Sequence, residues 1–322
     1  MVAYFLRRLL ISIIIFFSGI TVVFFIIHII PGDPVSNYVN PYLPEEVKQH
    51  LVETFGLNKP LIIQYFNWIL NLFKLDFGYS LVYSKPVILL IKNALLPTIF
   101  ITTSGLVFGT VIGCILGVFS AVRKNTIFDK LSNIFVIVFY SLPSFWTGVL
   151  LSLIFSYTLG LFPSSQLKSL YHDQLNVLER TMDYLYHATL PILSLGLSIM
   201  AVFAKYTRES MIKSLSSSFV VGALGRGINR KRILFKYCFK NALIPIINLI
   251  GTATPFIIGG AVTVEVVFSL PGMGRLLVSS ALSRDYPVIM AITTIVFMAV
   301  IMINFFIDII LYKIDPRVGL NE

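Results

Sequence analysis

Residues 9–30 of this chain, LLISIIIFFSGITVVFFIIHII, decide its fold class. The stretch holds no Asp, Glu, Lys or Arg. A helix needs about 20 apolar residues to cross a hydrocarbon core of about 30 Å. Arg7 and Arg8 precede the stretch, as in a signal peptide, but the apolar run is too long for one and no small-residue cleavage site follows it. We therefore expect an uncleaved transmembrane helix.

The composition of the whole chain agrees with a bilayer environment. Of its 322 residues, 57% are hydrophobic and only 12% are charged, and the mean hydropathy is +0.87. Soluble domains carry about 25% charged residues. The two cysteines, Cys114 and Cys238, have a spacing that suggests neither a metal site nor a disulfide framework. The composition therefore favours a single membrane domain.

Further apolar runs predict about six transmembrane helices. Backbone polar groups in lipid must be satisfied within the protein, and these runs are continuous rather than alternating, so helices are expected and a barrel is not. The prediction is an all-α, polytopic membrane protein. The expected spans are 9–30, 96–121, 131–160, 188–207, 243–268 and 287–312.

The distribution of lysine and arginine predicts the orientation in the membrane. If the N-terminus is cytoplasmic, most of the 25 basic residues fall on the inside, and the positive-inside rule then places both termini in the cytoplasm. The inside residues are Arg7, Arg8, Arg123, Lys124, Lys130, Lys205, Arg208, Lys213, Arg226, Arg230, Lys231, Arg232, Lys236, Lys240, Lys313 and Arg317.

We expect two parts, the first helix with an extracytoplasmic segment (1–95) and a five-helix core (96–322). Residues 31–95 are too polar to span. The Pro44-Glu45-Glu46-Val47 run predicts a helix start. Further on, apolar residues at helical spacing predict a short amphipathic helix. It either lies on the membrane or caps the outer mouth, or forms the core of a small extracytoplasmic subdomain. These residues are Leu61, Ile62, Tyr65, Phe66, Ile69, Leu70 and Phe73.

The inside segment 208–241 is strongly basic and interrupted by glycines. A serine at 216–218 can cap a short helix, and Gly227 can end it in a left-handed conformation. A second short helix would follow, with Ile233, Leu234, Tyr237 and Cys238 on one face. The segment therefore predicts two short helices joined by a glycine turn across the cytoplasmic end.

The sequence lacks the motifs of an enzyme or a nucleotide-binding subunit. No G-x-x-x-x-G-K-[ST] loop, G-x-S-x-G elbow or H-E-x-x-H helix occurs, and the four histidines form no metal pair at helical spacing. Glu265 and Asp308 fall near the ends of the fifth and sixth spans. For Glu265 we weigh a role in the solute pathway against a role in pairing or loop anchoring. For Asp308 we favour a structural role. Neither lies at the midplane, which argues against an ion-coupled secondary transporter.

Several motifs along the chain match one family. They are Tyr4-Phe5-Leu6-Arg7-Arg8-Leu9, Ile30-Pro31-Gly32-Asp33-Pro34, Phe55-Gly56-Leu57-Asn58-Lys59-Pro60, Asp76-Phe77-Gly78-Tyr79-Ser80, Leu190-Pro191, Thr207-Arg208-Glu209-Ser210-Met211, Glu265-Val266-Val267-Phe268-Ser269-Leu270-Pro271-Gly272-Met273-Gly274-Arg275, Arg284-Asp285-Tyr286-Pro287 and Asp315-Pro316-Arg317. The chain resembles, nearly end to end, the B-type integral-membrane permease subunits of ABC importers for dipeptides, oligopeptides and nickel.

The resemblance implies a type I ABC-importer permease fold and a loop that couples the permease to an ATPase. The family usually has an acidic or polar residue at Ser218 and a basic one at Leu224. The implied coupling residues are Ser218, Phe219, Gly222, Ala223, Gly225, Arg226, Gly227, Asn241, Ala242 and Pro245. The implied pathway or outer-gate residues are Glu265, Pro271, Gly272, Met273 and Gly274, although the Pro-Gly-Met-Gly turn also fits a purely structural role.

The resemblance also implies a complex. It would contain a second homologous permease, two cytoplasmic ATPase subunits that bind ATP and Mg, and an extracytoplasmic solute-binding protein. This chain would form half of the pathway, bind no cofactor or metal and catalyse no covalent step. Di- or oligopeptides are the expected substrates, with a nickel or metal chelate and glutathione as alternatives.

Overall fold

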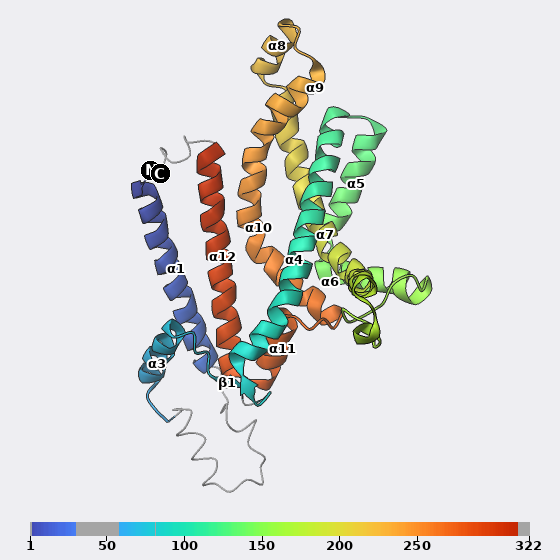
Figure 1. Ribbon diagram of the computed structural model, residues 1–322. Helices are drawn as coiled ribbons and strands as arrows, with labels where there is room; N and C mark the ends of the chain where they lie inside the picture. The colour runs from blue at the N-terminus through green and yellow to red at the C-terminus, as the bar shows by residue number, and fades with distance from the viewer. Residues whose placement is uncertain (1, 30–57, 81, 315–322) are drawn as a thin grey trace. The chain divides into compact units, whose positions relative to one another are not determined.

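The computed structural model describes residues 2–29, 58–80 and 82–314 (Figure 1). The predicted helix start at 44–47 lies outside these residues. The described elements are α1 (Val2–Ile29), α3 (Leu61–Phe73), β1 (Tyr79–Ser80), β2 (Lys85–Pro86), α4 (Val87–Val122), α5 (Ile127–Ser141), α6 (Ser144–Leu151), η1 (Ser152–Thr158), η2 (His172–Gln174), α7 (Val177–Leu215), α8 (Ser218–Gly225), α9 (Arg230–Arg232), η3 (Ile233–Cys238), α10 (Phe239–Val267), α11 (Met273–Ser283) and α12 (Tyr286–Ile314).

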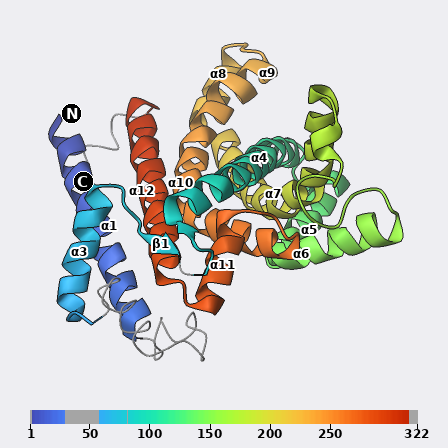
Figure 2. The ribbon, with the colours of Figure 1, turned by 60° about the horizontal axis from the view of Figure 1, so that its bottom comes forward.

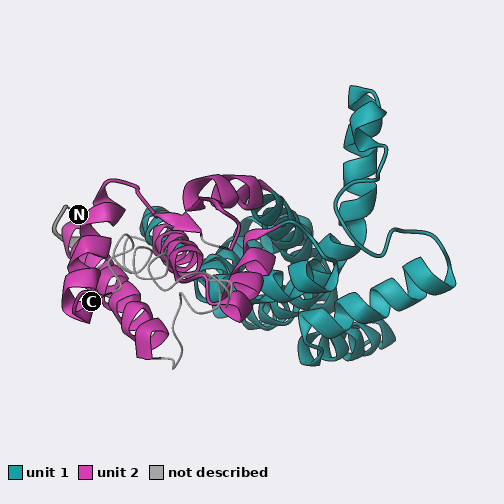
Figure 3. Ribbon diagram, turned by 90° about the horizontal axis from the view of Figure 1, so that it is seen from below, with its two compact units in different colours: residues 1, 97–271, 303–322 teal, residues 2–96, 272–302 magenta. Residues whose placement is uncertain are grey.

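The chain forms two compact units, coloured separately in Figure 3. Unit 1 contains residues 97–271 together with the chain from 303 onward, and unit 2 contains residues 2–96 and 272–302. The boundary inside α4 falls at Pro97. The predicted division into 1–95 and 96–322 stays a prediction.

The predicted all-α membrane fold is confirmed. Among the described residues, five helices are long and apolar enough to cross a bilayer, and the number is six if the bent pair, α5 followed by α6 and η1, counts as one span. The prediction of one continuous helix over 131–160 was wrong, because the two halves meet at 106°. Pro143 disfavours a helical conformation at the residue before it, and Leu142 accordingly lies in the extended region at ψ 126°.

The ends of α7 reach well beyond the predicted span 188–207. At its N-terminus, Asn176 and Glu179 form a capping box, in which each side chain accepts from the other residue's backbone N–H. At its C-terminus the helix continues through charged residues to Leu215. Hydropathy marks only the part of a helix that crosses the apolar layer, so it underestimates helices that extend past it.

Glycines at every fourth position of α4 face α7. A Cβ added at Gly109 would lie 2.7 Å from the carbonyl oxygen of Gly196, and one added at Gly117 would lie 2.6 Å from that of Ala204. A Cβ added at Gly113 would lie 2.7 Å from the carbonyl oxygen of Met200. Real side chains do not tolerate such distances. Glycine therefore allows the two backbones to touch, as small residues do in many membrane helix pairs.

The buried core of unit 1 lies between α7 and the helices around it. Phe203 and Leu195 of α7 are almost completely buried, and so are Ile101 of α4 and Phe268 beyond the end of α10. A second, smaller group joins α4, α5 and α7 through Val136, which packs with alanines of α7. Helix α7 is therefore the central helix of unit 1.

In unit 2, α3 confirms the predicted short amphipathic helix. Tyr65 and Trp68 pack on Phe24 of α1, with ring centroids 5.3 and 5.7 Å away, and the Tyr65 hydroxyl lies 2.7 Å from that of Thr21. On the other side of α3, Phe66 and Leu70 are 60% and 59% exposed. The helix therefore binds α1 through aromatic side chains and leaves a second apolar face open.

The glycine contact between α4 and α7 predicts a steric effect that a control can isolate. We expect Gly113→Ala to destabilise the purified protein by about 1–3 kcal/mol, because the added methyl meets backbone atoms that cannot move aside. Gly259→Ala in α10, where no atom lies within 4 Å of the new methyl, should be neutral or stabilising by up to about 1 kcal/mol. Thermal unfolding in detergent measures both, and equal effects would contradict the close-contact account.

Candidate functional site

The segment between α7 and α10 begins with a two-residue break in the helix. Ser216 and Ser217 separate α7 from α8, and both hydroxyls donate back to the carbonyl of Lys213, at 3.1 and 2.9 Å. Ser217 occupies the predicted N-cap position of α8, but its side chain makes no capping hydrogen bond. The two serine hydroxyls therefore bond to the C-terminal end of α7 and do not cap the N-terminus of α8. Only these two residues connect the two helices.

The end of α8 confirms the predicted role of Gly227. This residue has φ +72°, and its N–H donates to the carbonyl of Leu224 at 2.9 Å. The N–H of Ile228 donates to the carbonyl of Ala223 at 3.1 Å. These two hydrogen bonds define a Schellman motif with glycine in the left-handed position.

The predicted second short helix is the beginning of a longer one. Asn229 caps α9 by accepting from the N–H of Lys231 at 2.9 Å. From there α9, η3 and α10 follow without a break. Ile233 and Cys238 are buried on the predicted face. The prediction of a separate second helix was wrong, because α9, η3 and α10 follow one another with no residue between them.

The outer surface of α8 is apolar and contains exposed glycines. Val221 is 70% exposed and Leu224 44%, whereas Val220 packs into the core of unit 1. A Cβ added at Gly222 or Gly225 would meet no atom within 4 Å. The helix stands with α9 at one end of unit 1, where α7 and α10 meet it (Figures 1 and 2).

A basic group of residues adjoins this surface. Arg226, Arg230, Lys231 and Arg232 are all exposed. No ion pair involves them within the part of the chain that the structure describes. The α8–α9 segment therefore offers an apolar surface beside a patch of positive charge.

Three of the predicted coupling residues, Asn241, Ala242 and Pro245, lie on α10. Ala242 is buried in the same core cluster as Val220, with Ala223 packed against it, whereas Asn241 and Pro245 are exposed. Asn241 lies in the first turn of α10, and the predicted cytoplasmic segment 208–241 stays a prediction. Phe219 and Ser218 are exposed at the start of α8.

The predicted outer residues fall at the end of α10 and the start of α11. Glu265 is 1% exposed and accepts a hydrogen bond of 2.6 Å from the hydroxyl of Thr98. The chain then turns through Ser269, at φ +52°. Pro271 closes this stretch of unit 1, and in unit 2 Gly272 occupies the N-cap position of α11, followed by Met273 and Gly274 in its first turn. The pathway and gate roles stay predictions.

The structure contains an ionic site that the sequence analysis did not identify. Asp129, in the first turn of α5, is 3% exposed and accepts two hydrogen bonds from Arg208 of α7, at 2.7 and 2.8 Å. Ser120 of α4 also donates to this carboxylate, and the backbone N–H of Asn125 does so at 3.0 Å. A single carboxylate thus joins three helices.

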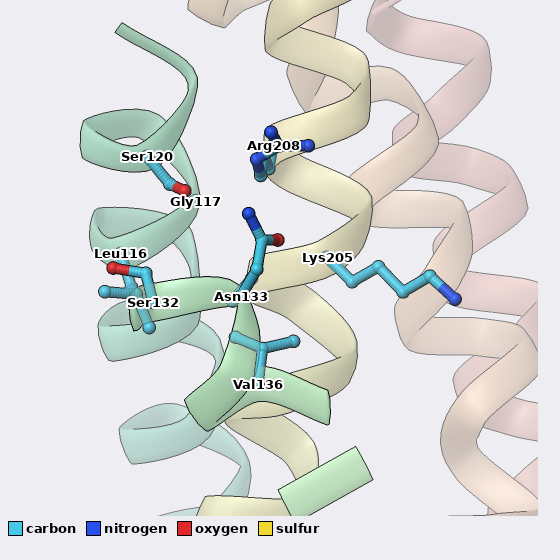
Figure 4. A pocket seen from close by; sticks show the side chains of 9 residues that line it. Leu116, Gly117, Ser120, Ser132, Asn133, Val136, Lys205 and Arg208 are labelled. Carbon is cyan, nitrogen blue, oxygen red and sulfur yellow. The ribbon is translucent and has the colours of Figure 1, made fainter. Parts of the chain in front are cut away.

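A small pocket lies beside this ion pair (Figure 4). Ser120, Ser132, Asn133 and Arg208 contribute polar groups to its lining, and its volume is about 10 Å³, the size that holds one water molecule. Lys205, one turn before Arg208, extends over the ring of Tyr140 in α5 at 4.8 Å. Helix α7 therefore presents two cations to α5.

Two of the sequence motifs meet in unit 2 although they are far apart in the chain. Ser80 of β1 donates to Asp285, which precedes α12, and both are buried. The hydroxyls of Tyr83 and Ser279 lie 2.9 Å apart. The β1–β2 hairpin is thereby fixed beside α11 (Figure 2). Burial raises the pKa of Asp285 above its ordinary value, and the hydrogen bond from Ser80 opposes this rise.

None of the described residues forms a group of His, Cys, Asp and Glu side chains that could hold a metal ion. The arrangement instead offers an apolar and basic surface at α8–α9, an ionic connection between helices, and a buried carboxylate at the far end of α10.

Comparisons with known proteins cover the whole chain. The family described as "Binding-protein-dependent transport system inner membrane component" matches residues 109–320, and its N-terminal companion, "Binding-prot-dependent transport system membrane comp, N-term", matches residues 1–102. The oligopeptide transport system permease protein AppB of Bacillus subtilis is 36% identical over 320 residues, which is 99% of each chain.

Other relatives are almost as similar. The dipeptide transport system permease protein DppB of Lactococcus lactis is 35% identical, over 99% of this chain and 100% of that protein. The glutathione transport system permease protein GsiC of Escherichia coli K12 is 33% identical over 99% of each. Among solved structures, an inward-facing MetNI methionine ABC transporter matches 70% of this chain and 97% of that one, with TM-score 0.55 and 17% identity, which shows the fold.

The Schellman motif predicts a local effect of replacing Gly227. We expect Gly227→Ala to cost about 1–2 kcal/mol, because an L-residue is strained in the left-handed region. Hydrogen exchange measured by mass spectrometry should speed up in the peptide that contains the amides of Gly227 and Ile228. Gly222→Ala, at an ordinary helical position with open space around it, serves as the control and should not speed exchange. Equal exchange in both variants would contradict the assignment.

Proposed function

Because this chain belongs to the family of binding-protein-dependent transport system inner membrane components, we propose that it forms half of the translocation pathway of an importer for peptides. It is a non-catalytic permease subunit of an ABC transporter. The relatives named for oligopeptide, dipeptide and glutathione transport support peptides as the substrate class, with glutathione as the alternative. Selection among these solutes would rest mainly with a separate binding protein.

The proposed complex contains a second homologous permease, two cytoplasmic ATPase subunits that bind ATP and Mg, and an extracytoplasmic solute-binding protein. This multi-pass membrane protein would lie in the bacterial inner membrane with both termini in the cytoplasm. The excess of basic residues on the inside segments supports this orientation. In unit 1, the C-terminal end of α12 and the basic α8–α9 segment point to the same end (Figure 1), as the orientation requires.

The single observation that carries the proposed coupling role is the open space at the α8 glycines. A glycine in a helix costs stability, about 0.5–1 kcal/mol relative to alanine, unless something requires its small size. Within the described chain nothing approaches Gly222 or Gly225, whereas the α4 glycines contact α7. We therefore infer that the small residues of α8 serve close contact with another subunit, and that exposed Phe219, Val221 and Leu224 would add apolar area to it.

The local structure suggests how the contact transmits force. Helix α8 is joined to α7 by only two residues, and its other end is fixed by the turn at Gly227 before α9 continues into α10. A displacement of α8 by the ATPase would therefore act on two membrane helices at once. The basic residues beside α8 would favour an acidic surface on the partner.

At the outer end, Glu265 and the 271–274 turn are proposed as part of the pathway or its gate. The Glu265 carboxylate is buried in the last turn of α10 and accepts a hydrogen bond from the hydroxyl of Thr98 on α4. Movement of α10 relative to α4 would stretch this hydrogen bond.

The docking proposal predicts a separation of stability from assembly. We expect Gly222→Leu to leave the thermal stability of the isolated chain within about 0.5 kcal/mol, as for a surface substitution. It should abolish co-purification of the ATPase subunits and uptake of a labelled dipeptide. Gly259→Leu, also at a glycine with open space but on α10, should retain the ATPase.

The experiment starts with a pull-down of the tagged wild-type protein from mild detergent. Recovery of a second permease and ATPase subunits is the expected result. A homo-oligomer without an ATPase would contradict the proposed complex and favour a self-contained, ion-coupled carrier. Retention of the ATPase by Gly222→Leu would refute the docking surface alone.

A further inference from the structure

The ion pair between Asp129 and Arg208 holds three helices of unit 1 together at one point. Asp129 belongs to α5 and Arg208 to α7, and Ser120 brings α4 to the same carboxylate. The side chains of the pair are 4% and 22% exposed. A bidentate arginine–carboxylate contact fixes orientation as well as distance, because two parallel hydrogen bonds define a plane. The pair therefore fixes the rotation of α5 relative to α7.

The place of Arg208 on α7 connects this contact with α8. Two turns of helix separate Arg208 from Leu215, where α7 ends, and Ser216 and Ser217 alone separate that end from α8. A helix of this length is stiff over two turns. Any displacement of α8 therefore reaches Arg208 directly, and the ion pair passes it on to α5.

The other end of the bent α5–α6 pair is also attached to α7. The hydroxyl of Ser194 donates to the backbone carbonyl of Ser144 at 2.8 Å, just beyond the bend at Pro143. The side-chain hydroxyl of Ser144 also lies 3.2 Å from the hydroxyl of Thr263 on α10. The bent pair is thus held at its bend by α7 and α10, and near its start by the ion pair.

The chemistry of the contact favours a positional role over a stabilising one. A buried ion pair gains little stability over well-packed apolar side chains, because both charges lose their hydration. Other groups from the surrounding helices also face this site. Lys205 of α7 adds a second positive charge near α5, Asn133 donates to Asp129 at 3.0 Å, and Ser120 and Ser132 line the adjoining pocket. This network gives a specific geometry that apolar packing would leave free to slide.

We propose that the Asp129–Arg208 ion pair is the coupling latch of this permease: it makes the start of α5 move with α7 and α4 when α8 is displaced. This inference rests on the proposed docking of α8 to an ATPase. Asp129 and Arg208 would act through the helices that they join, and they are therefore positioning residues. Without the latch, the start of α5 would no longer follow α7, although the bend stays attached to α7 through Ser144, and ATP hydrolysis would continue without opening the pathway.

The test uses the complete complex in proteoliposomes, with ATP hydrolysis and uptake of a labelled dipeptide measured together. We expect Asp129→Asn to assemble with the ATPase and to hydrolyse ATP, while uptake per ATP falls about tenfold, the order of coupling between distant sites. Asp173→Asn is the matched control, because its carboxylate is 84% exposed and lies 3.6 Å from Lys168. It should leave uptake per ATP unchanged.

A double variant separates the latch from a purely structural role. Asp129→Asn leaves Arg208 without its carboxylate, so thermal stability of the complex should fall. Asp129→Asn combined with Arg208→Gln removes both charges and should recover that stability, while uptake per ATP stays low. Recovery of both quantities in the double variant would overturn the latch, and so would normal uptake per ATP in Asp129→Asn.

If Asp129→Asn fails to assemble, Arg208→Lys provides the second measurement. It keeps the positive charge but loses the two-pronged contact. The latch predicts a partial loss of uptake per ATP with unchanged assembly, and no loss would overturn it. Failure of the proposed function is distinguishable, because the wild-type chain would then recover no ATPase and show no ATP-dependent uptake.

Discussion

The close approach of α4 to α7 is the constraint on which unit 1 depends. Within lipid, the hydrophobic effect does not favour the association of helices, so helix pairs gain stability from close packing. Glycines at 105, 109, 113 and 117 remove the side chains that would keep the backbones apart. This contact brings Ser120 to the same side as Arg208, and the carboxylate of Asp129 can then bond to both. The ionic site is therefore a consequence of helix packing.

Local signals in the sequence were sufficient for much of the fold and for part of the site. Apolar runs marked the membrane helices because lipid requires them, and Gly227 marked the end of α8 because its backbone conformation is strained for other residues. The apolar pattern at 61–73 marked α3. The side of α3 that packs was harder to assign, because both of its faces carry apolar side chains and the apolar pattern does not distinguish the rings that contact α1, which are those of Tyr65, Trp68 and Phe73.

The features that the sequence analysis missed depend on contacts between distant residues. Asp129 in the first turn of α5 has the pattern of an ordinary helix start, and nothing local relates it to Arg208, 79 positions away. The pairing of Ser80 with Asp285 spans 205 positions. The bend at Pro143 had a local signal, but the apolar composition continues through it, and hydropathy alone therefore joined α5 and α6 into one helix.

The way α8 ends has a consequence for how subunits of this kind come together. Its final turn is closed by the chain's own backbone at Leu224 and Gly227, and its start follows α7 directly. The proposed docking helix is therefore complete in the isolated chain, and binding would not have to offset the entropy of ordering it. Assembly would then be the docking of finished parts rather than folding coupled to binding, with little affinity lost to conformational ordering.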